Sequence, residues 1–204
     1  MSRPPTIGIV DYGVGNLASV WHALHALDFR CRISHDPDVL DATDVLLLPG
    51  VGAFPAAMHS LSQRGLDDYL RNKARAGHPL VGICLGMQLL ADASLEQSST
   101  PGLGLIPGIV RPLDGGHWHI GWNMLTPTGS DPLFEITRNQ AVYFNHSFAM
   151  DGDCPWITSV AHFGGQPVAA SVRRDSVVGL QFHPEKSQRA GRAILRAVVL
   201  ALKS

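Results

Sequence analysis

The chain has 204 residues, which at about 150 residues per domain favours one hydrophobic core over two. Only 16% of the residues are charged, 16 Lys and Arg against 17 Asp and Glu, where an ordinary soluble domain has about 25%. A net charge of −1 gives no electrostatic reason to bind nucleic acid or an acidic membrane surface, so both are disfavoured as partners.

The first half of the chain alternates short apolar runs with amphipathic segments. We expect strands at residues 6–11, 30–34, 44–48 and 80–83. Helices are expected after Asn16, which can cap the first of them, within residues 55–76, and from residue 84 to about residue 93. Strands and helices in alternation predict a mostly parallel sheet with helices on both faces.

The second half carries shorter segments separated by Gly, Pro and Asp. They lie at residues 109–111, 141–144, 157–162, 168–172 and 177–182, and we interpret them as antiparallel additions to the sheet. Ser187 is expected to cap a closing helix with an apolar inner stripe. The predicted fold is therefore α/β, with residues 1–204 as one domain whose central sheet is mostly parallel, is flanked by helices and has an antiparallel β extension.

Cysteine usage indicates the compartment. Cys31, Cys84 and Cys154 are an odd number and lie far apart, which suits neither a disulfide framework nor a close-spaced zinc site. The N-terminus lacks the apolar run of a signal peptide, and the long charge-free stretches are interrupted by Gly, Pro, Ser and His, unlike membrane spans. We therefore expect a cytoplasmic protein.

Residues 82–86, Gly-Ile-Cys-Leu-Gly, have the pattern of a nucleophile elbow, in which a buried strand turns sharply into a helix. The flanking glycines let strand and helix pass closely, and the start of a helix favours a thiolate. Taken alone, this motif is equally consistent with Cys84 as a catalytic nucleophile and with Cys84 as a small buried apolar residue. A second motif is needed to decide.

The second motif is His183-Pro184-Glu185, directly after a predicted strand. Residues i and i+2 of an extended segment point the same way, so Glu185 can orient the imidazole of His183 toward a nucleophile on another strand. A third motif, Pro49-Gly50-Val51-Gly52, follows the strand at 44–48, and its glycines allow backbone amides to turn toward an anion. A catalytic Cys-His-Glu triad with an oxyanion hole becomes the favoured interpretation.

At this point the sequence resembles a known family. Residues 49–52 (PGVG), 82–88 (GICLGMQ) and 181–187 (QFHPEKS) are similar to the motifs of class I (triad) glutamine amidotransferases. Residues 11–16 (DYGVGN), 119–123 (HIGWN) and 186–188 (KSQ) narrow the resemblance to the glutaminase subunits of imidazole glycerol phosphate synthase. The resemblance spans almost the whole chain and implies the class I glutamine amidotransferase fold.

The resemblance implies roles for individual residues. Cys84 attacks the side-chain amide of glutamine, His183 is the general base and then acid, and Glu185 orients His183. Glutamine is hydrolysed through a glutamyl thioester to glutamate and ammonia, with no cofactor and no metal. Positions that bind glutamine or the oxyanion in this family correspond here to Gly50, Val51, Gly52, Gln88, His146, Ser147 and Phe148.

The resemblance also implies a partner. In this family ammonia passes to a separate (β/α)₈-barrel cyclase subunit of a heterodimer, which makes imidazole glycerol phosphate and an aminoimidazole carboxamide ribonucleotide in histidine biosynthesis. Asn16, Trp122 and Lys186 match positions that face this partner. The sequence departs from the family pattern at Trp118, where Pro is usual, and at Asn145, where Val is usual.

Other interpretations remain open. Residues 13–18 (GVGNLA), with Asp36 further on, also satisfy a dinucleotide-binding fingerprint, although Asp11 would place negative charge beside a pyrophosphate. His117 and His119 offer two imidazoles to a metal without a third ligand at short spacing. A stand-alone cysteine hydrolase needs the same triad, and a paralogous ammonia donor would serve another synthase.

Overall fold

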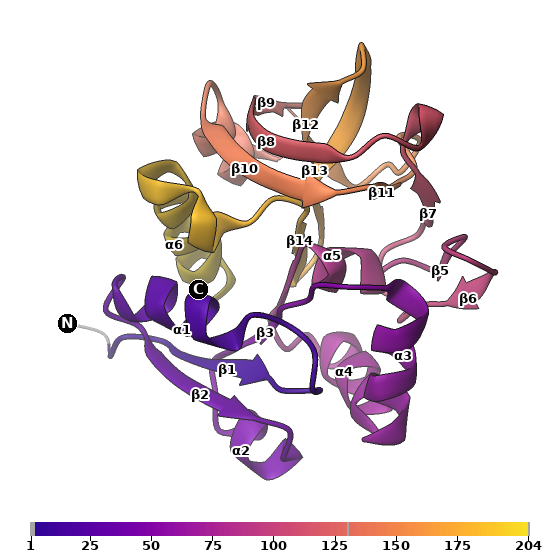
Figure 1. Ribbon diagram of the computed structural model, residues 1–204. Helices are drawn as coiled ribbons and strands as arrows, with labels where there is room; N and C mark the ends of the chain where they lie inside the picture. Colours follow the sequence, from indigo (N-terminus) through magenta and orange to yellow (C-terminus); the bar gives the residue numbers. More distant parts are fainter. Residues whose placement is uncertain (1–2, 130, 204) are drawn as a thin grey trace.

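The computed structural model describes residues 3–129 and 131–203, and Figure 1 shows how its layers are arranged. Its central sheet has the strand order β2-β1-β3-β4-β14-β13-β12-β9. The parallel part contains β1 (Thr6–Val10), β2 (Arg30–Ser34), β3 (Val45–Leu48), β4 (Leu80–Ile83) and β14 (Val177–Leu180). The antiparallel part contains β13 (Gln166–Arg174), β12 (Ile157–Phe163) and β9 (Thr126–Pro127).

Helices cover both faces of the parallel strands. Val45 and Leu47 of β3 face a cluster that includes α1 (Leu17–His25) and α6 (Gln188–Lys203). Leu46 and Leu48 face the opposite way, toward α3 (Phe54–Gln63), α4 (Leu66–Arg75) and α5 (Leu85–Leu89). The short α2 (Pro37–Asp41) packs beside β1 and β2. Burial on both faces explains the continuous apolar runs, and the predicted α/β fold is confirmed.

Beyond α5, the described residues also form two smaller sheets (Figure 1). One is an antiparallel ribbon of β8 (His119–Met124) and β10 (Ala141–His146). The other has the order β11-β7-β5-β6 and contains β11 (Phe148–Met150), β7 (Ile109–Pro112), β5 (Ala93–Ser94) and β6 (Thr100–Pro101). Among the described residues there are also the 3-10 turns η1 (Asp114–Gly116), η2 (Pro132–Thr137) and η3 (Pro184–Lys186).

Two helices differ from the sequence expectation. The single helix expected within residues 55–76 is two helices, because Gly65 adopts φ +66° between α3 and α4. The helix expected to reach about residue 93 ends at Leu89. Its last carbonyl groups are taken by a distant segment, since the amides of Leu103 and Leu105 bond to the carbonyls of Leu89 and Leu90.

Two predictions for the C-terminal part were wrong. Residues 177–180 do not join the sheet purely as an antiparallel addition: β14 lies parallel to β4, with β13 antiparallel on its other side. Ser187 precedes α6, but its hydroxyl donates to the carbonyl of His183 at 2.6 Å and accepts from the amide of Tyr143 at 2.9 Å. Its side chain therefore fastens the turn after β14 to β10.

Within the described residues, no helix is both long and apolar enough to cross a membrane.

Candidate active site

Cys84 stands at the turn between β4 and α5, with φ 54° and ψ −110°. This backbone conformation is unfavourable for any residue with a side chain and persists only where packing enforces it. Two glycines do so. A Cβ atom on Gly82 would lie 2.5 Å from the carbonyl oxygen of Gly86, and one on Gly86 would collide with the carbonyl oxygen of Leu48. The close passage of strand and helix thus places Cys84 at the carboxyl end of the parallel strands.

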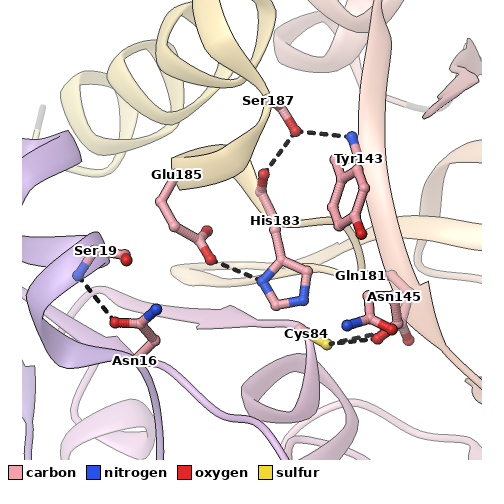
Figure 2. Close-up of polar contacts among 9 residues, drawn as sticks. All are labelled: Asn16, Ser19, Cys84, Tyr143, Asn145, Gln181, His183, Glu185 and Ser187. Atoms are coloured by element: carbon pink, nitrogen blue, oxygen red, sulfur yellow. Dashed lines mark hydrogen bonds and ion pairs between the residues drawn. The ribbon is translucent and has the colours of Figure 1, made fainter. Parts of the chain in front are cut away.

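His183 follows β14, the strand next to β4, so its imidazole reaches the same edge of the sheet. Its Nδ1 lies 2.7 Å from Oε1 of Glu185, and each of these side chains is only 3% exposed. The expected contact is present, but the two residues meet through the 3-10 turn η3 and not along an extended segment. Figure 2 shows the imidazole of His183 between Glu185 and Cys84.

The electrostatics of this pair favour a charged imidazole. Burial alone lowers the pKa of His183, but hydrogen bonding to Cys84 and Glu185, together with their negative charge, outweighs it. The net effect raises the pKa of His183 to about 9. At neutral pH the imidazole therefore carries a proton that it can give away.

Polar groups from two further segments surround the thiol. Nε2 of Gln181 lies 3.9 Å from Sγ of Cys84, and the carbonyl oxygen of Asn145 lies 4.0 Å from it (Figure 2). Oε1 of Gln181 in turn accepts from Nε2 of Gln88 at 3.2 Å. Because Asn145 uses its backbone carbonyl, the departure from Val at this position leaves the contact to Cys84 intact.

The glycine loop after β3, residues 49–52, is held in place by Tyr12. The hydroxyl of Tyr12 donates to the carbonyl of Pro49 at 2.7 Å, and burial, with the nearby Cys84, raises the pKa of Tyr12 so that the hydroxyl keeps its proton. A Cβ atom on Gly50 would lie 2.8 Å from both Tyr12 Oη and the Cβ of Leu85. Gly52 adopts φ +99°, which suits glycine.

A cleft of about 300 Å³ opens on Cys84 and His183. Its remaining walls are formed by Val51, Gly52, Leu85, Gln88, Glu96, Trp118, Asn145, His146, Ser147 and Phe148. The cleft therefore brings together the residues predicted for the nucleophile, the base and the glutamine site, with two exceptions. Gly50 packs against Tyr12 and α5, and Glu185 lies behind His183.

The predicted site residues did not include four residues of this cleft, Leu85, Glu96, Trp118 and Asn145. The carboxylate of Glu96 accepts from the first amide of α3, that of Phe54, at 2.8 Å. The sequence does carry a signal for Glu96, because it is the single charged residue between Asp92 and Arg111. Trp118 is 62% exposed at the rim and lies outside every motif that pointed to chemistry.

The residues predicted to face a partner lie on the surface. Trp122 is 50% exposed, and its ring centroid is 6.2 Å from that of Tyr143. Nζ of Lys186 lies 6.0 Å from the same Tyr143 ring. Asn16 is exposed, and its side chain caps α1 by accepting from the amide of Ser19 at 3.2 Å. Trp122, Tyr143 and Lys186 therefore form one continuous patch.

The dinucleotide interpretation loses support from local hydrogen bonds. The carboxylate of Asp11 accepts from the amide of Gly13 at 3.0 Å, so the glycine turn already holds an anionic group. Asp36 is engaged too, because it caps α2 by accepting from the amide of Asp38 at 3.0 Å. Across the described residues, no three His, Cys, Asp or Glu side chains gather where they could hold a metal ion.

Comparison with known proteins gives consistent results. The family model for "Glutamine amidotransferase class-I" matches residues 8–202. The imidazole glycerol phosphate synthase subunit HisH of Symbiobacterium thermophilum is 45% identical over 192 residues, which cover 93% of this chain and 91% of that protein. The protein of the same name from Lacticaseibacillus casei is 46% identical over 194 residues, with 93% of each chain covered.

Solved structures share the fold at much lower identity. PurLQS from Thermotoga maritima matches with a TM-score of 0.78 at 20% identity, over 98% of this chain. A glutamine amidotransferase from Thermotoga maritima matches with a TM-score of 0.72 at 14% identity, over the whole of both chains. At these identities the likeness concerns the fold alone.

Proposed function

The chain belongs to the class I glutamine amidotransferases and, within them, to the HisH subunits of imidazole glycerol phosphate synthase, and on this premise we propose that it hydrolyses glutamine and delivers the ammonia to a cyclase subunit. Residues 1–204 act as one amidotransferase domain in this proposal. The observation that carries it is the buried His183–Glu185 pair, 2.7 Å apart, beside a cysteine held at a strained turn.

In the first half-reaction Cys84 is the nucleophile. Its thiolate attacks the side-chain amide carbon of glutamine and forms a tetrahedral intermediate with a negatively charged oxygen. Backbone amides of Val51 and Gly52 are the proposed donors to this oxygen, supported by their place in the cleft wall. One such donor is typically worth about 10² to 10³ in rate.

His183 transfers the protons. Its raised pKa of about 9 means that it holds a proton which it gives to the leaving nitrogen, and ammonia departs as the thioester forms. The now neutral imidazole takes a proton from water, which attacks the thioester carbon and releases glutamate and the thiolate. Glu185 keeps Nδ1 of His183 as a donor, so Nε2 is the atom that serves the reaction.

The cleft supplies groups for the other end of the substrate. Glu96 brings a carboxylate whose natural counterpart is the α-ammonium group of glutamine. Gln88, His146, Ser147 and Phe148 also line the cleft, with Nε2 of Gln88 donating to the carbonyl of Phe148 at 2.7 Å. A carboxylate in the cleft wall favours a free amino acid as substrate.

The partner in this proposal is a (β/α)₈-barrel cyclase that forms a heterodimer with this chain and uses ammonia in the lyase reaction of histidine biosynthesis. Its proposed contact surface is the exposed patch of Trp122 and Lys186. Asn16, which is exposed at the start of α1, is a further proposed contact. Three free cysteines support a cytoplasmic location.

The test is a glutaminase assay of the chain mixed with the cyclase subunit and its nucleotide ligand. Cys84→Ala is expected to abolish release of glutamate and ammonia, whereas Cys154→Ala, which removes another buried thiol, retains activity. Retained glutaminase activity in Cys84→Ala refutes the proposed nucleophile. Glutaminase activity without imidazole glycerol phosphate formation would assign the chain to another synthase.

A further inference from the structure

The segment 119–123 on β8 has no part in the reaction described above, yet one of its side chains is deeply buried. His119 is 3% exposed, whereas its strand neighbours Ile120 and Trp122 point outward and are 59% and 50% exposed. The ring of His119 stacks between Phe144, with centroids 4.2 Å apart, and Phe163, with centroids 4.5 Å apart. A polar ring in this setting needs partners for both of its nitrogens.

The hydrogen bonds around Asn123 determine which nitrogen of His119 carries the hydrogen. Oδ1 of Asn123 accepts from the amide of Met124 at 2.8 Å, which orients the side-chain amide. Its Nδ2 then has two hydrogens to donate, one to the carbonyl of His162 at 2.7 Å and one to Nε2 of His119 at 3.1 Å. Nε2 of His119 is therefore an acceptor, and Nδ1 carries the hydrogen.

The same reasoning extends to the next ring. Nδ1 of His119 lies 3.1 Å from Nε2 of His146 and donates to it, so Nε2 of His146 is an acceptor as well. His146 then carries its hydrogen on Nδ1, which lies 2.9 Å from the carbonyl oxygen of Phe148. A single assignment thus satisfies all four ring nitrogens, and it leaves both imidazoles neutral.

The surroundings of the two rings keep them neutral. Burial lowers the pKa of His119 to about 4. Burial is also the main cause that lowers the pKa of His146 to about 4, assisted by His119 and His183 and opposed by the carbonyl of Phe148. At neutral pH the chain of donors therefore runs in one direction, from Asn123 through both rings to Phe148.

This chain ends in the wall of the glutamine cleft. The carbonyl of Phe148 also accepts from Nε2 of Gln88 at 2.7 Å, and Gln88 and Phe148 both line the cleft beside Cys84. We propose that His119 and Asn123 are positioning residues, which fix His146 as the Nδ1–H tautomer and thereby hold Phe148 and Gln88 in place for glutamine. The inference rests on the proposed function and assigns a task to two residues outside the cleft.

The first test reads the tautomers directly and needs no activity. Nitrogen-15 NMR of histidine-labelled chain in complex with its cyclase is expected to show His119 and His146 as neutral Nδ1–H tautomers at neutral pH. The His119→Asn and His146→Asn variants assign the signals by loss of a peak. A His146 ring that is protonated, or that carries its hydrogen on Nε2, overturns the proposal.

The second test separates hydrogen bonding from packing at His119. His119→Phe keeps an aromatic ring between Phe144 and Phe163 but cannot donate to His146. His119→Asn loses the ring but places an amide nitrogen about where Nδ1 stands, so it still donates. The Phe variant is expected to raise KM for glutamine about tenfold with kcat changed less than about twofold, which corresponds to one lost buried hydrogen bond.

The Asn variant is expected to stay within about threefold of the wild-type KM, since it keeps the donor. If the Phe variant retains the wild-type KM while the Asn variant does not, His119 serves only as packing and the proposal fails. Failure of the proposed function has a different signature, because wild-type complex without glutaminase activity would leave the tautomer measurement valid. Should His119→Asn not fold, the tautomers measured by NMR and the KM of His119→Phe still test the proposal.

Discussion

Tyr12 donates a hydrogen bond of 2.7 Å to the carbonyl of Pro49, and this bond joins the segment after β1 to the glycine loop beside Cys84. Tyr12 is fully buried, and the next residue of the loop, Gly50, packs against its hydroxyl. The loop that holds the proposed oxyanion donors is thereby fastened on the side away from the cleft. Its position depends on a residue in the first strand connection, far away in sequence.

Tyr12→Phe is expected to lower kcat of the complex about tenfold, because the freed loop no longer presents its amides at a fixed position. The variant also leaves the carbonyl of Pro49 without its donor, which costs about 1–2 kcal/mol of unfolding free energy. Steady-state kinetics and chemical denaturation measure the two effects. Tyr69→Phe is the matched control, since that hydroxyl bonds to the exposed Asp41 at 2.7 Å. Equal kcat values in the two variants would contradict the role of Tyr12.

Glu185→Gln is expected to lower the pKa of His183 from about 9, since the charge of Glu185 and the hydrogen bond to its carboxylate both raise this pKa. Because the folded pKa lies above the unfolded one, the charged His183 stabilises the fold fully below pH 6.5 and loses this contribution as pH rises through about 9. The advantage of wild type over the variant in unfolding free energy should shrink across that window.

An NMR titration of the His183 ring measures the shift in its pKa. Glu135→Gln is the control, because Glu135 pairs with Arg138 at the surface and its removal should leave the His183 titration unchanged. A His183 pKa that stays near 9 in Glu185→Gln would show that Glu185 does not set it.

Much of the site was predictable because its parts are local in sequence. Strands β1, β3 and β4 are short apolar runs buried on both faces, and Cys84 follows such a run between two glycines. His183 and Glu185 are two residues apart, so their contact needs only a turn. Parallel pairing of β4 and β14 then brings the two motifs together.

The features that were predicted wrongly or missed depend on contacts between segments distant in sequence. The end of α5 is set by amides of residues 103–106, and Ser187 bonds to β10 instead of capping α6. Glu96 reaches the cleft only because its loop folds back onto the start of α3. The partners of His119 likewise come from β10, β12 and its own strand, which no local pattern reveals.

Glu96→Gln tests the proposed contact to the α-ammonium group of glutamine. The amide oxygen still accepts from the amide of Phe54, so α3 keeps its N-terminal bond while the negative charge is lost. KM for glutamine should rise about tenfold with little change in kcat, as expected for loss of a charge-assisted hydrogen bond. With glutaramate, which lacks the amino group, wild type and variant should behave alike. A similar loss with both substrates would contradict the assigned contact.

Trp122→Ala is expected to weaken binding of the cyclase subunit about thirtyfold, which corresponds to about 2 kcal/mol. Trp122 lies with Ile120 and Met124 on the outer side of β8, where all three are at least 48% exposed, and an apolar patch of this kind marks a protein contact. Trp156→Ala is the control, because that indole is 37% exposed and lies near Arg174. Isothermal titration of each variant with the cyclase measures the loss. If both variants bind like wild type, or lose affinity equally, the outer side of β8 is not the docking surface.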